Sequence, residues 1–546
     1  MYSLLYNISK EKSSIVNIFL SFLAYFYTFH SEEGAVVHIF ARIVLKNCNS
    51  SCNYIQNRVL KARKLGDFKQ GRIKSAFAKK VGGKLNLPKL RLPARASIWY
   101  TLSVIIGRGV GFLLTPVFTH LLSERSFGLY SLYTSWLGIF TIVSTLELSG
   151  SVFMRENQKS DERDKLLRSA CALELLLVSI VCTLYFTFYR YFSTLTELGR
   201  LLSAVMFIQI FLSSVINLYL TASKFRYKYL TVFLINTVTG ISPMLIGIVL
   251  IKIFNVRVYA KILAQLGVSL ATFGILIYII FKNGKSISPK MMLGLFRSAI
   301  HHFPHYISIA ILTRADKLFV SSAFGKEALA RYSVADTVGS LLIFMISAPL
   351  SALSPWILRK LSSKNFVTVG RVYDVGCRII LWLSLILLGF APEIMDFLTP
   401  KSYHEALFAA YPIAVSAIPY FSYAVISVAF THSGGALSSV ASVVGGGASI
   451  LLSYLFTKLP HFTYVSFAIP ICYFIMLSVG IFIGRKKELY KFINLGKTLS
   501  LTLFSGLIAL MLFLLRDSLP LRIGALLLCL IPLIFDFGRG AALVKE

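Results

Sequence analysis

Charged side chains are scarce in this sequence. Asp, Glu, Lys and Arg make up 14% of its 546 residues, and Asp and Glu together number only 23. Soluble domains carry about 25% charged residues. The chain is instead 56% hydrophobic with a mean hydropathy of +0.72, more apolar surface than one interior could hide. These values exclude a soluble enzyme and a disordered tail protein. They also exclude a nucleic-acid-binding domain, despite a net charge of +33.

Cysteines are few and follow no framework. Cys48 and Cys52 are four residues apart without a second pair, and the other cysteines lie singly inside apolar runs. This spacing argues against a disulfide scaffold and against a structural zinc site. His301, His302 and His305 form a cluster that is typical of an interfacial position. We therefore expect no metal and no cofactor.

Long apolar runs are what the sequence has in abundance. From about residue 97 to residue 538, runs of roughly 17–25 apolar residues alternate with short polar breaks. Each run is long enough to cross about 30 Å of hydrocarbon as a helix. The sequence predicts an all-α polytopic membrane protein with about 14 transmembrane helices. The seventh run, 293–321, is the least apolar of them.

Basic residues indicate the orientation. Lys and Arg concentrate in the loops after the second, fourth, sixth, eighth and twelfth runs, such as 155–168 and 485–497. Cytoplasmic loops carry such an excess. We therefore expect both ends of the helical body on the cytoplasmic side of a bacterial inner membrane, although Lys252, Arg257 and Lys261 would then lie outside.

The two halves of the sequence resemble each other. Residues 122–131 (LSERSFGLYS) are similar to residues 324–333 (FGKEALARYS), and each segment joins two apolar runs. Six spans separate the copies, so both halves share one orientation about an axis along the membrane normal. Chance similarity in a turn rich in Gly, Tyr and Ser is the alternative. We predict an N-lobe over 97–281 with helices 1–6, a C-lobe over 282–484 with helices 7–12, and two additional helices over 485–546.

Residues 1–96 differ from the rest. Residues 58–95 are densely basic and would lie against anionic membrane lipid. Alternatively, 1–96 is translated upstream sequence and the assigned start is wrong. We expect no function from this extension.

Cations inside the predicted spans are the best functional signal. A charge at the centre of a membrane helix costs roughly 2.5–3.5 kcal/mol on insertion scales, and such charges usually face a partner or a water-filled cavity. Arg108 lies in the first span, and Arg314 and Lys317 lie in the seventh, with Arg297 near its start. First helices of two lobes would line a shared cleft, where guanidinium groups suit a pyrophosphate. Local pairing with carboxylates is the alternative.

Acidic residues inside the spans have two readings. Glu147 and Glu174 are candidates for coupling to a proton, or they pack and reach the interface. Asp316 and Asp336 are candidates for ion coupling or for pairing with Arg314 and Lys317.

Several motifs resemble polysaccharide flippases of the Wzx type, within the multidrug/oligosaccharidyl-lipid/polysaccharide exporter (MOP) superfamily. The segments that carry the resemblance are 107–109 (GRG), 112–116 (FLLTP), 121–131 (LLSERSFGLYS), 314–320 (RADKLFV) and 332–335 (YSVA). The similarity covers roughly residues 97–490. Such proteins usually start just before their first helix, which adds to the doubt about 1–96.

The resemblance implies a function. Such flippases move undecaprenyl-pyrophosphate-linked oligosaccharide across the cytoplasmic membrane for O-antigen, lipopolysaccharide, capsule or exopolysaccharide biosynthesis, by alternating access between two lobes. Arg108, Arg297, Arg314 and Lys317 are then the candidates for contacting the lipid pyrophosphate. A polysaccharide polymerase and a chain-length regulator are implied partners, and the protein would not be an enzyme.

Two alternatives stay open. A cation-coupled multidrug antiporter of the same superfamily would want acidic residues in the first span, which has Arg108 and none. A membrane polysaccharide polymerase or ligase would want a large outer loop, and the loops on that side are short.

Overall fold

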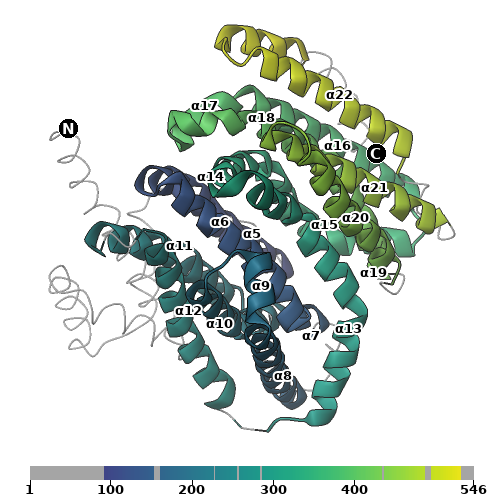
Figure 1. Ribbon diagram of the computed structural model, residues 1–546. Helices are drawn as coiled ribbons and strands as arrows, with labels where there is room; N and C mark the ends of the chain where they lie inside the picture. Colours follow the sequence, from purple (N-terminus) through teal and green to yellow (C-terminus); the bar gives the residue numbers. More distant parts are fainter. Residues whose placement is uncertain are drawn as a thin grey trace, which may run out of the picture. The chain divides into compact units, whose positions relative to one another are not determined.

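The computed structural model describes residues 92–152, 160–226, 228–254, 257–282, 284, 286–432, 436–485 and 493–529. Every regular element in these ranges is a helix (Figure 1). Residues 97–273 and 285–546 form one compact unit, while 1–96 and 274–284 form a separate one, and each is treated by itself. Most of the predicted basic extension, 1–91, lies outside the described residues.

The helices follow the predicted apolar runs. Those before residue 283 are α5 (Leu92–Leu121), α6 (Glu124–Thr145), α7 (Leu148–Val152), α8 (Ser160–Thr187), α9 (Tyr189–Thr196), α10 (Arg200–Phe225), α11 (Tyr229–Phe254) and α12 (Arg257–Lys282). Those after it are α13 (Pro289–Leu312), α14 (Ala315–Gly339), α15 (Leu341–Ser362), α16 (Phe366–Gly389), α17 (Ala391–Leu398), η2 (Lys401–Ala406), α18 (Leu407–Val415), α19 (Ala417–His432), α20 (Ala436–Phe456), η3 (Phe462–Phe467), α21 (Ala468–Gly484) and α22 (Leu495–Leu514).

Polar side chains cap several of these helices at the end where backbone N–H groups lack partners. Ser123 accepts from the backbone of Ser126 before α6, Asn365 accepts from Thr368 before α16, and Asn494 accepts from Lys497 before α22. Such side-chain oxygens satisfy donors that the helix itself cannot. The short loops between apolar runs therefore set where the helices begin.

Membrane-spanning helices are fewer than predicted within the described ranges. Ten helices there are long and apolar enough to cross a membrane, or up to eleven if the bent pair Ala315–Gly339 and Leu341–Ser347 is one span. Two further apolar helices, Gly109–Leu121 and Leu519–Cys529, are shorter. The count of about 14 is thus not confirmed. The seventh run is interrupted at Thr313 and Arg314, and the last one extends beyond the described residues.

The predicted turn between the seventh and eighth runs lies inside α14. Gly325 has φ 87° and ψ 177°, a conformation open to glycine, so two helices meet there. The corresponding turn in the first half is Leu122–Ser123, between α5 and α6. A Cβ atom at Gly128 would stand 1.8 Å from the backbone oxygen of Lys326, which places the two turns close together. We call this end of the helices end A.

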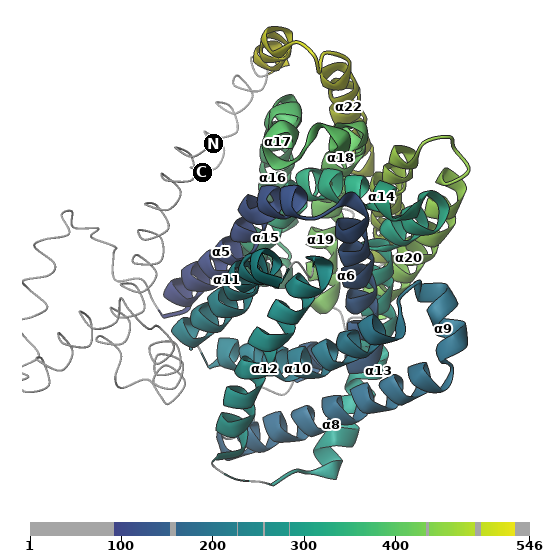
Figure 2. The same ribbon diagram turned by 60° about the vertical axis from the view of Figure 1, so that its left-hand side comes forward.

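Helices α6 and α14 pack directly against each other (Figures 1 and 2). Beyond Gly325, much of α14 is buried, with Leu329, Tyr332 and Val338 at 0% exposure, while Glu327 stays exposed. The pair α6 and α14 therefore joins the two halves of the chain.

Helix α22 is attached to the rest by a buried hydroxyl. The Tyr373 hydroxyl of α16 lies 2.8 Å from Ser422 Oγ of α19 and 2.6 Å from Thr498 Oγ1 of α22. All three side chains are buried. The predicted division at 281/282 and 484/485 stays a prediction, although α12 and α21 end next to those boundaries.

Candidate functional site

Arg314 occupies a break between two helices. Helix α13 ends at Leu312, and Arg314 has φ −137° and ψ −17° before α14 begins. The Thr313 hydroxyl donates to the carbonyl oxygen of Ile309 at 2.9 Å. Hydroxyls that bond back to the preceding turn often bend helices. The seventh predicted span is therefore broken at the residue that carries its cation.

The Arg314 guanidinium lies against the backbone of α6 at Gly138. A Cβ atom at Gly138 would stand 2.1 Å from Nε and 2.3 Å from Cζ of Arg314. The arginine is partly buried, and its Nη1 also donates to the Thr313 hydroxyl at 3.0 Å. Since Gly138 lies within the candidate span Glu124–Thr145, a cation from the second half meets the first half at membrane depth.

Lys317 has a carboxylate partner. Its Nζ lies 2.6 Å from Asp336 Oδ2, with the two side chains 20% and 16% exposed. The neighbouring Asp316 is 2% exposed and accepts a hydrogen bond from the Tyr332 hydroxyl at 2.8 Å. Both contacts join the part of α14 before Gly325 to the part after it. This is the arrangement that the pairing alternative describes.

The other two predicted cations are Arg297 and Arg108. Arg297 is exposed on α13, and its carbonyl oxygen lies 2.5 Å from His301 Nδ1. Arg108 belongs to α5, and its side chain lies outside what the structure describes. Arg314 is therefore a predicted cation whose described position is against the opposite half.

The two glutamates lie at neighbouring elements of the first half. Glu147 has φ 49° between α6 and α7, and its Oε1 accepts from the Ser149 hydroxyl at 2.7 Å. Glu174 of α8 is 2% exposed, and within the described part of the chain its Oε2 has no hydrogen-bond partner. Helix α7 packs against α8, α10 and α13, and Gly150 of α7 approaches the Tyr306 hydroxyl.

A pair of hydroxyls joins equivalent positions of the two halves. Ser131 Oγ and Ser333 Oγ, which are 202 residues apart in sequence, lie 2.5 Å from each other. These are the serines that align in the two similar segments. Self-contact between equivalent residues is what a twofold axis produces.

Ion pairs and hydrogen bonds surround this contact at end A. Arg331 Nε donates to Glu124 Oε2 at 2.8 Å, and Arg331 Nη1 donates to Glu405. Glu405 Oε1 also lies 3.0 Å from His461 Nε2. The Thr119 hydroxyl of α5 donates to the carbonyl oxygen of Leu398 at 2.7 Å. The two halves are therefore fastened together at end A.

Lys261 shows what sequence reasoning did not predict. Its ammonium lies 3.8 Å from the centre of the Phe118 ring and 3.9 Å from that of Tyr130. Aromatic faces attract cations in this range. The rings come from α5 and α6, far from α12 in sequence, so no local pattern signals the contact. The contacts of Gly138 and of Arg522 were not predicted for the same reason.

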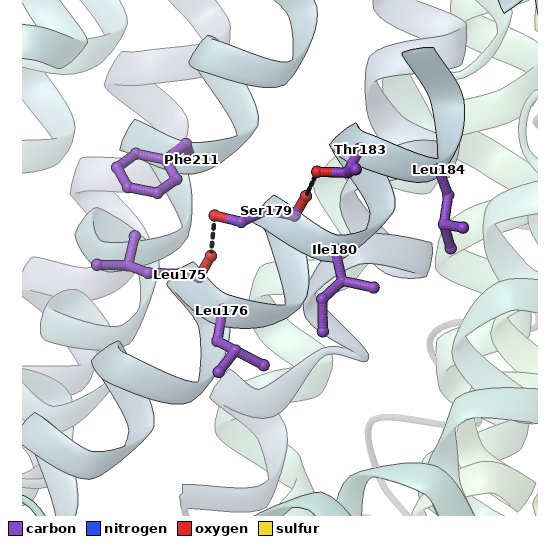
Figure 3. A pocket seen from close by; sticks show the side chains of 7 residues that line it. All are labelled: Leu175, Leu176, Ser179, Ile180, Thr183, Leu184 and Phe211. Atoms are coloured by element: carbon purple, nitrogen blue, oxygen red, sulfur yellow. Dashed lines mark hydrogen bonds between the residues drawn. The ribbon is translucent and has the colours of Figure 1, made fainter. Parts of the chain in front are cut away.

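One apolar hollow of about 590 Å³ lies on the first half of the chain. Figure 3 shows it along α8 between Leu175 and Leu184, with Phe211 of α10 on one side. The hydroxyls of Ser179 and Thr183 bond to carbonyl oxygens of their own helix, at 2.8 and 2.9 Å. The hollow is therefore apolar, and its described lining includes none of Arg297, Arg314 and Lys317.

A second, polar cavity of about 730 Å³ lies next to the end A contacts. It is lined by α17, η2, the start of α18, the end of α22 and the helix Leu519–Cys529. Arg522 is 2% exposed and donates to Glu393 at 2.8 Å from Nη1 and 2.5 Å from Nη2. The described lining of this cavity likewise includes none of Arg297, Arg314 and Lys317.

Comparisons with known proteins show what this chain is similar to. Residues 94–360 match the family described as polysaccharide biosynthesis protein. A comparison with curated proteins found no significant match.

Solved structures share the fold at low identity. The lipid II flippase MurJ, in an inward closed conformation, has a TM-score of 0.61 and 17% identity, covering 82% of this chain and 100% of the flippase. A MOP superfamily transporter from Pyrococcus furiosus has a TM-score of 0.54 and 15% identity, covering 72% and 96%. An outward-facing multidrug resistance MATE transporter of the MOP superfamily has a TM-score of 0.52 and 15% identity, covering 74% and 97%.

The helices, the family match and the fold agree. The chain is a multi-pass membrane protein whose fold is that of transporters. The resemblance predicted from its sequence is confirmed at the level of family and fold. Residues 94–360 match the family described as polysaccharide biosynthesis protein, and the fold of the chain is shared with solved flippase and transporter structures.

Proposed function

We propose that the protein flips an undecaprenyl-pyrophosphate-linked oligosaccharide from the inner to the outer leaflet of the bacterial cytoplasmic membrane. The glycan would serve O-antigen, capsule or exopolysaccharide biosynthesis. The observation that carries this proposal is the position of Arg314, whose guanidinium lies at membrane depth against α6. The family match and the flippase-like fold support it.

A guanidinium in this position suits a pyrophosphate. Keeping a charge within a membrane span costs several kcal/mol, and such charges usually have a function. The planar fork of arginine binds phosphate oxygens in a bidentate way, and a low local dielectric strengthens the attraction. Arg314 lies at the break before α14, and its guanidinium occupies the space that a side chain at residue 138 would fill. Arg314 is therefore the proposed headgroup contact.

The remaining predicted cations take secondary roles in this proposal. Lys317 exchanges its bond to Asp336 for the substrate as the pyrophosphate passes. Arg297, exposed on α13, meets the headgroup at the entrance, and Arg108 of α5 stays a proposed headgroup contact from the first half. The basic extension contacts anionic membrane lipid.

End A is the proposed outer end. The basic loops then lie on the cytoplasmic side, which is where the substrate would enter. The contacts of Ser131 with Ser333 and of Glu124 with Arg331 would close the outer side in this conformation. Alternating access between the lobes 97–281 and 282–484 requires these contacts to open. The helices of 485–546 stay with the second lobe.

Glu174 is the proposed coupling residue. It is buried, and its Oε2 has no hydrogen-bond partner within the described residues. A buried carboxylate is costly unless it binds a proton or a cation. Asp316 also has a buried oxygen, Oδ1, without a hydrogen-bond partner among the described residues, but it lies beside Lys317 and accepts from Tyr332, so we assign it a structural role together with Glu147 and Asp336. The proposed partners after flipping are a polysaccharide polymerase and a chain-length regulator, and the protein itself carries out no catalytic step.

Complementation of a bacterial strain without its flippase tests the proposal. We expect the wild-type chain to restore surface glycan, Arg314→Ala to fail, and Arg314→Lys to restore part of it, because an ammonium cannot bind both oxygens in a fork. Arg371→Ala, an exposed cation of α16, is the control and should behave as wild type. Protein levels in the membrane are measured for each variant.

Transport of the purified protein completes the test. Proteoliposomes with a fluorescent undecaprenyl-pyrophosphate-linked saccharide report the rate at which the lipid changes leaflet. Normal flipping by Arg314→Ala, or no flipping by the wild-type chain, would contradict the proposal. Drug extrusion in place of flipping would favour the antiporter alternative.

A further inference from the structure

The polar cavity at end A has walls of unusual chemistry. Four carboxylates line it, from Glu393, Asp396, Glu405 and Asp517, together with the guanidinium groups of Arg516 and Arg522. Two aromatic rings, Phe408 and Phe513, also line it and stand edge to face with their centres 4.8 Å apart. Its volume of about 730 Å³ falls in the usual range of ligand sites, roughly 300–1,000 Å³.

Arg522 points to a ligand in this cavity. It is 2% exposed, and its terminal nitrogens are occupied by Glu393 and by the carbonyl oxygen of Gly389. Within the described residues its buried Nε has no acceptor. A buried donor without an acceptor costs about 1–3 kcal/mol. A ligand with a hydroxyl or ether oxygen at this point would remove that cost.

His404 adds a second group of the same kind. Its Nε2 lies 3.2 Å from Asp396 Oδ1, yet the two do not form a hydrogen bond of good geometry, and within the described residues Nε2 has no other partner. An imidazole nitrogen and a carboxylate side by side can hold the two neighbouring hydroxyls of one ring. Among the described residues, unpaired polar groups thus come from two elements that line the cavity, η2 and the helix Leu519–Cys529.

The charge balance selects the class of ligand. Four carboxylates and two guanidinium groups line the cavity, and Arg331 beside it pairs with Glu405, so the cavity keeps an excess of one negative charge when His404 and His461 are neutral. A phosphate or a uronic acid would meet repulsion from this wall. Carboxylates accept hydrogen bonds from hydroxyl and amino groups, and arginine donates to ring and hydroxyl oxygens. The apolar face of a sugar ring would pack on Phe408 or Phe513.

We propose that this cavity is a carbohydrate site for neutral or amino-substituted sugars of a glycan at end A. The proposal rests on the proposed function, because a glycan reaches end A only as part of the transported lipid. The site is separate from Arg314, which would hold the pyrophosphate. Glu405 belongs both to the cavity wall and to the contact with Arg331, so a bound sugar lies next to the ion pairs that fasten end A.

A glycan array tests the proposal with the full chain in lipid nanodiscs. The probes are malto- and chito-oligosaccharides, amine-bearing chitosan oligomers, and oligogalacturonates as the acidic class. We expect retention of neutral or amino-bearing oligomers and no retention of the oligogalacturonates. The double variant Asp396→Asn, Asp517→Asn should lower retention by at least about tenfold, because hydrogen bonds to charged groups are the stronger ones. Both side chains are largely exposed, at 65% and 91%, so the fold should tolerate the change.

The matched control is Glu327→Gln, an exposed carboxylate of α14 outside the cavity, which should leave retention unchanged. Retention of none of the probes, retention of the acidic class, or equal retention by the double variant overturns the proposal. A competition experiment with spermidine gives a further outcome that overturns the proposal. If spermidine displaces every bound oligomer equally well, whatever its sugar, the cavity binds amines and not carbohydrate.

Flipping in proteoliposomes separates this proposal from the proposed function. If the wild-type chain flips the lipid-linked saccharide but no free oligomer binds, only the carbohydrate site is wrong. If free oligomers bind and the double variant loses them, but the wild-type chain flips no lipid, the site stands as a glycan-binding site and the proposed function is wrong.

Discussion

Ser131 of α6 and Ser333 of α14 share one hydrogen bond, with their hydroxyl oxygens 2.5 Å apart across 202 residues of sequence. Since they are equivalent positions of the two similar segments, the pair marks where the halves meet around an approximate twofold axis. Arg331, Glu124 and Glu405 add ion pairs around it. These polar contacts lie within the larger packed interface of α6 and α14, which also contains buried apolar side chains.

A disulfide at this pair should stop transport. In a background with the native cysteines replaced by serine, we expect Ser131→Cys with Ser333→Cys to cross-link under oxidation, because sulfur atoms at these positions come within reach of an S–S bond of about 2.05 Å. Flipping should fall to the background rate and recover after reduction. The rate is measured in proteoliposomes with Ser131→Cys alone as the control. Full transport by the cross-linked protein would show that end A does not open.

Gly138→Ala should displace Arg314 without removing its charge. The added methyl group would meet the far end of a flexible side chain, so the fold is kept while the guanidinium moves. Loss of one charge-assisted hydrogen bond, about 1.5–3 kcal/mol, lowers a rate by roughly tenfold to a hundredfold. We therefore expect slow flipping at a normal protein level.

Two variants make this test specific. Gly267→Ala on α12 adds a methyl group in open space and should flip at the wild-type rate. The double variant Gly138→Ala, Arg314→Ala should be no slower than Arg314→Ala alone, because both changes act on one contact. Additive losses would contradict the contact as the cause.

Glu174→Gln should remove the dependence of flipping on an ion gradient. The amide keeps the size of the buried side chain but cannot exchange a proton or hold a cation through a negative charge. Initial flipping rates are compared with and without an imposed pH or sodium gradient. Glu162→Gln, an exposed acid at the start of α8, serves as the control. An unchanged response to both gradients in Glu174→Gln would exclude Glu174 as the coupling residue.

The pair Glu393 and Arg522 should make stability depend on pH. Hydrogen bonds from Arg522 hold the pKa of the Glu393 carboxyl below its ordinary value. Glu393 lies on α17, outside the candidate spans. Because the folded-state pKa is lowered, this stabilisation is present above the ordinary carboxyl pKa, about 4.3, and is lost as the pH falls through the folded-state value.

Thermal unfolding in detergent tests this dependence. Glu393→Gln should melt at a lower temperature than wild type at pH 7, and the difference in melting temperature, or gap, should be smaller at pH 3. An equal gap at both values would rule out the ionised pair as the cause, and Glu197→Gln controls for a general loss of charge.

The sequence was sufficient to predict the positions of the helices and some of the contacts between them. Apolar runs predicted where the helices lie, because a span needs a minimum length of apolar residues. The similar segments around Ser131 and Ser333 predicted two equivalent turns, and the structure has them at Leu122–Ser123 and Gly325. The pairing alternative named Asp336 as a carboxylate of the next span that could reach Lys317 across the interface, and the structure has this contact.

Contacts between distant segments could not be predicted in this way. No pattern indicates that Gly138 leaves room for Arg314, or that rings of α5 and α6 surround Lys261. Arg522 and Glu393 are 129 residues apart and meet only because α17 and the last described helix fold onto each other. Interruptions such as the break at Arg314 depend on the same tertiary contacts.

The hydroxyl of Tyr373 has a consequence for shortened forms of the protein. It bonds to Thr498, which lies beyond the residues that match the family. A chain ending near residue 490 would lose that partner and leave an apolar face of α16 and α18 without the helix that covers it. Truncation would then expose this apolar surface to lipid or to other copies of the protein. The C-terminal helices are therefore needed for a stable, monodisperse protein even if transport itself takes place elsewhere.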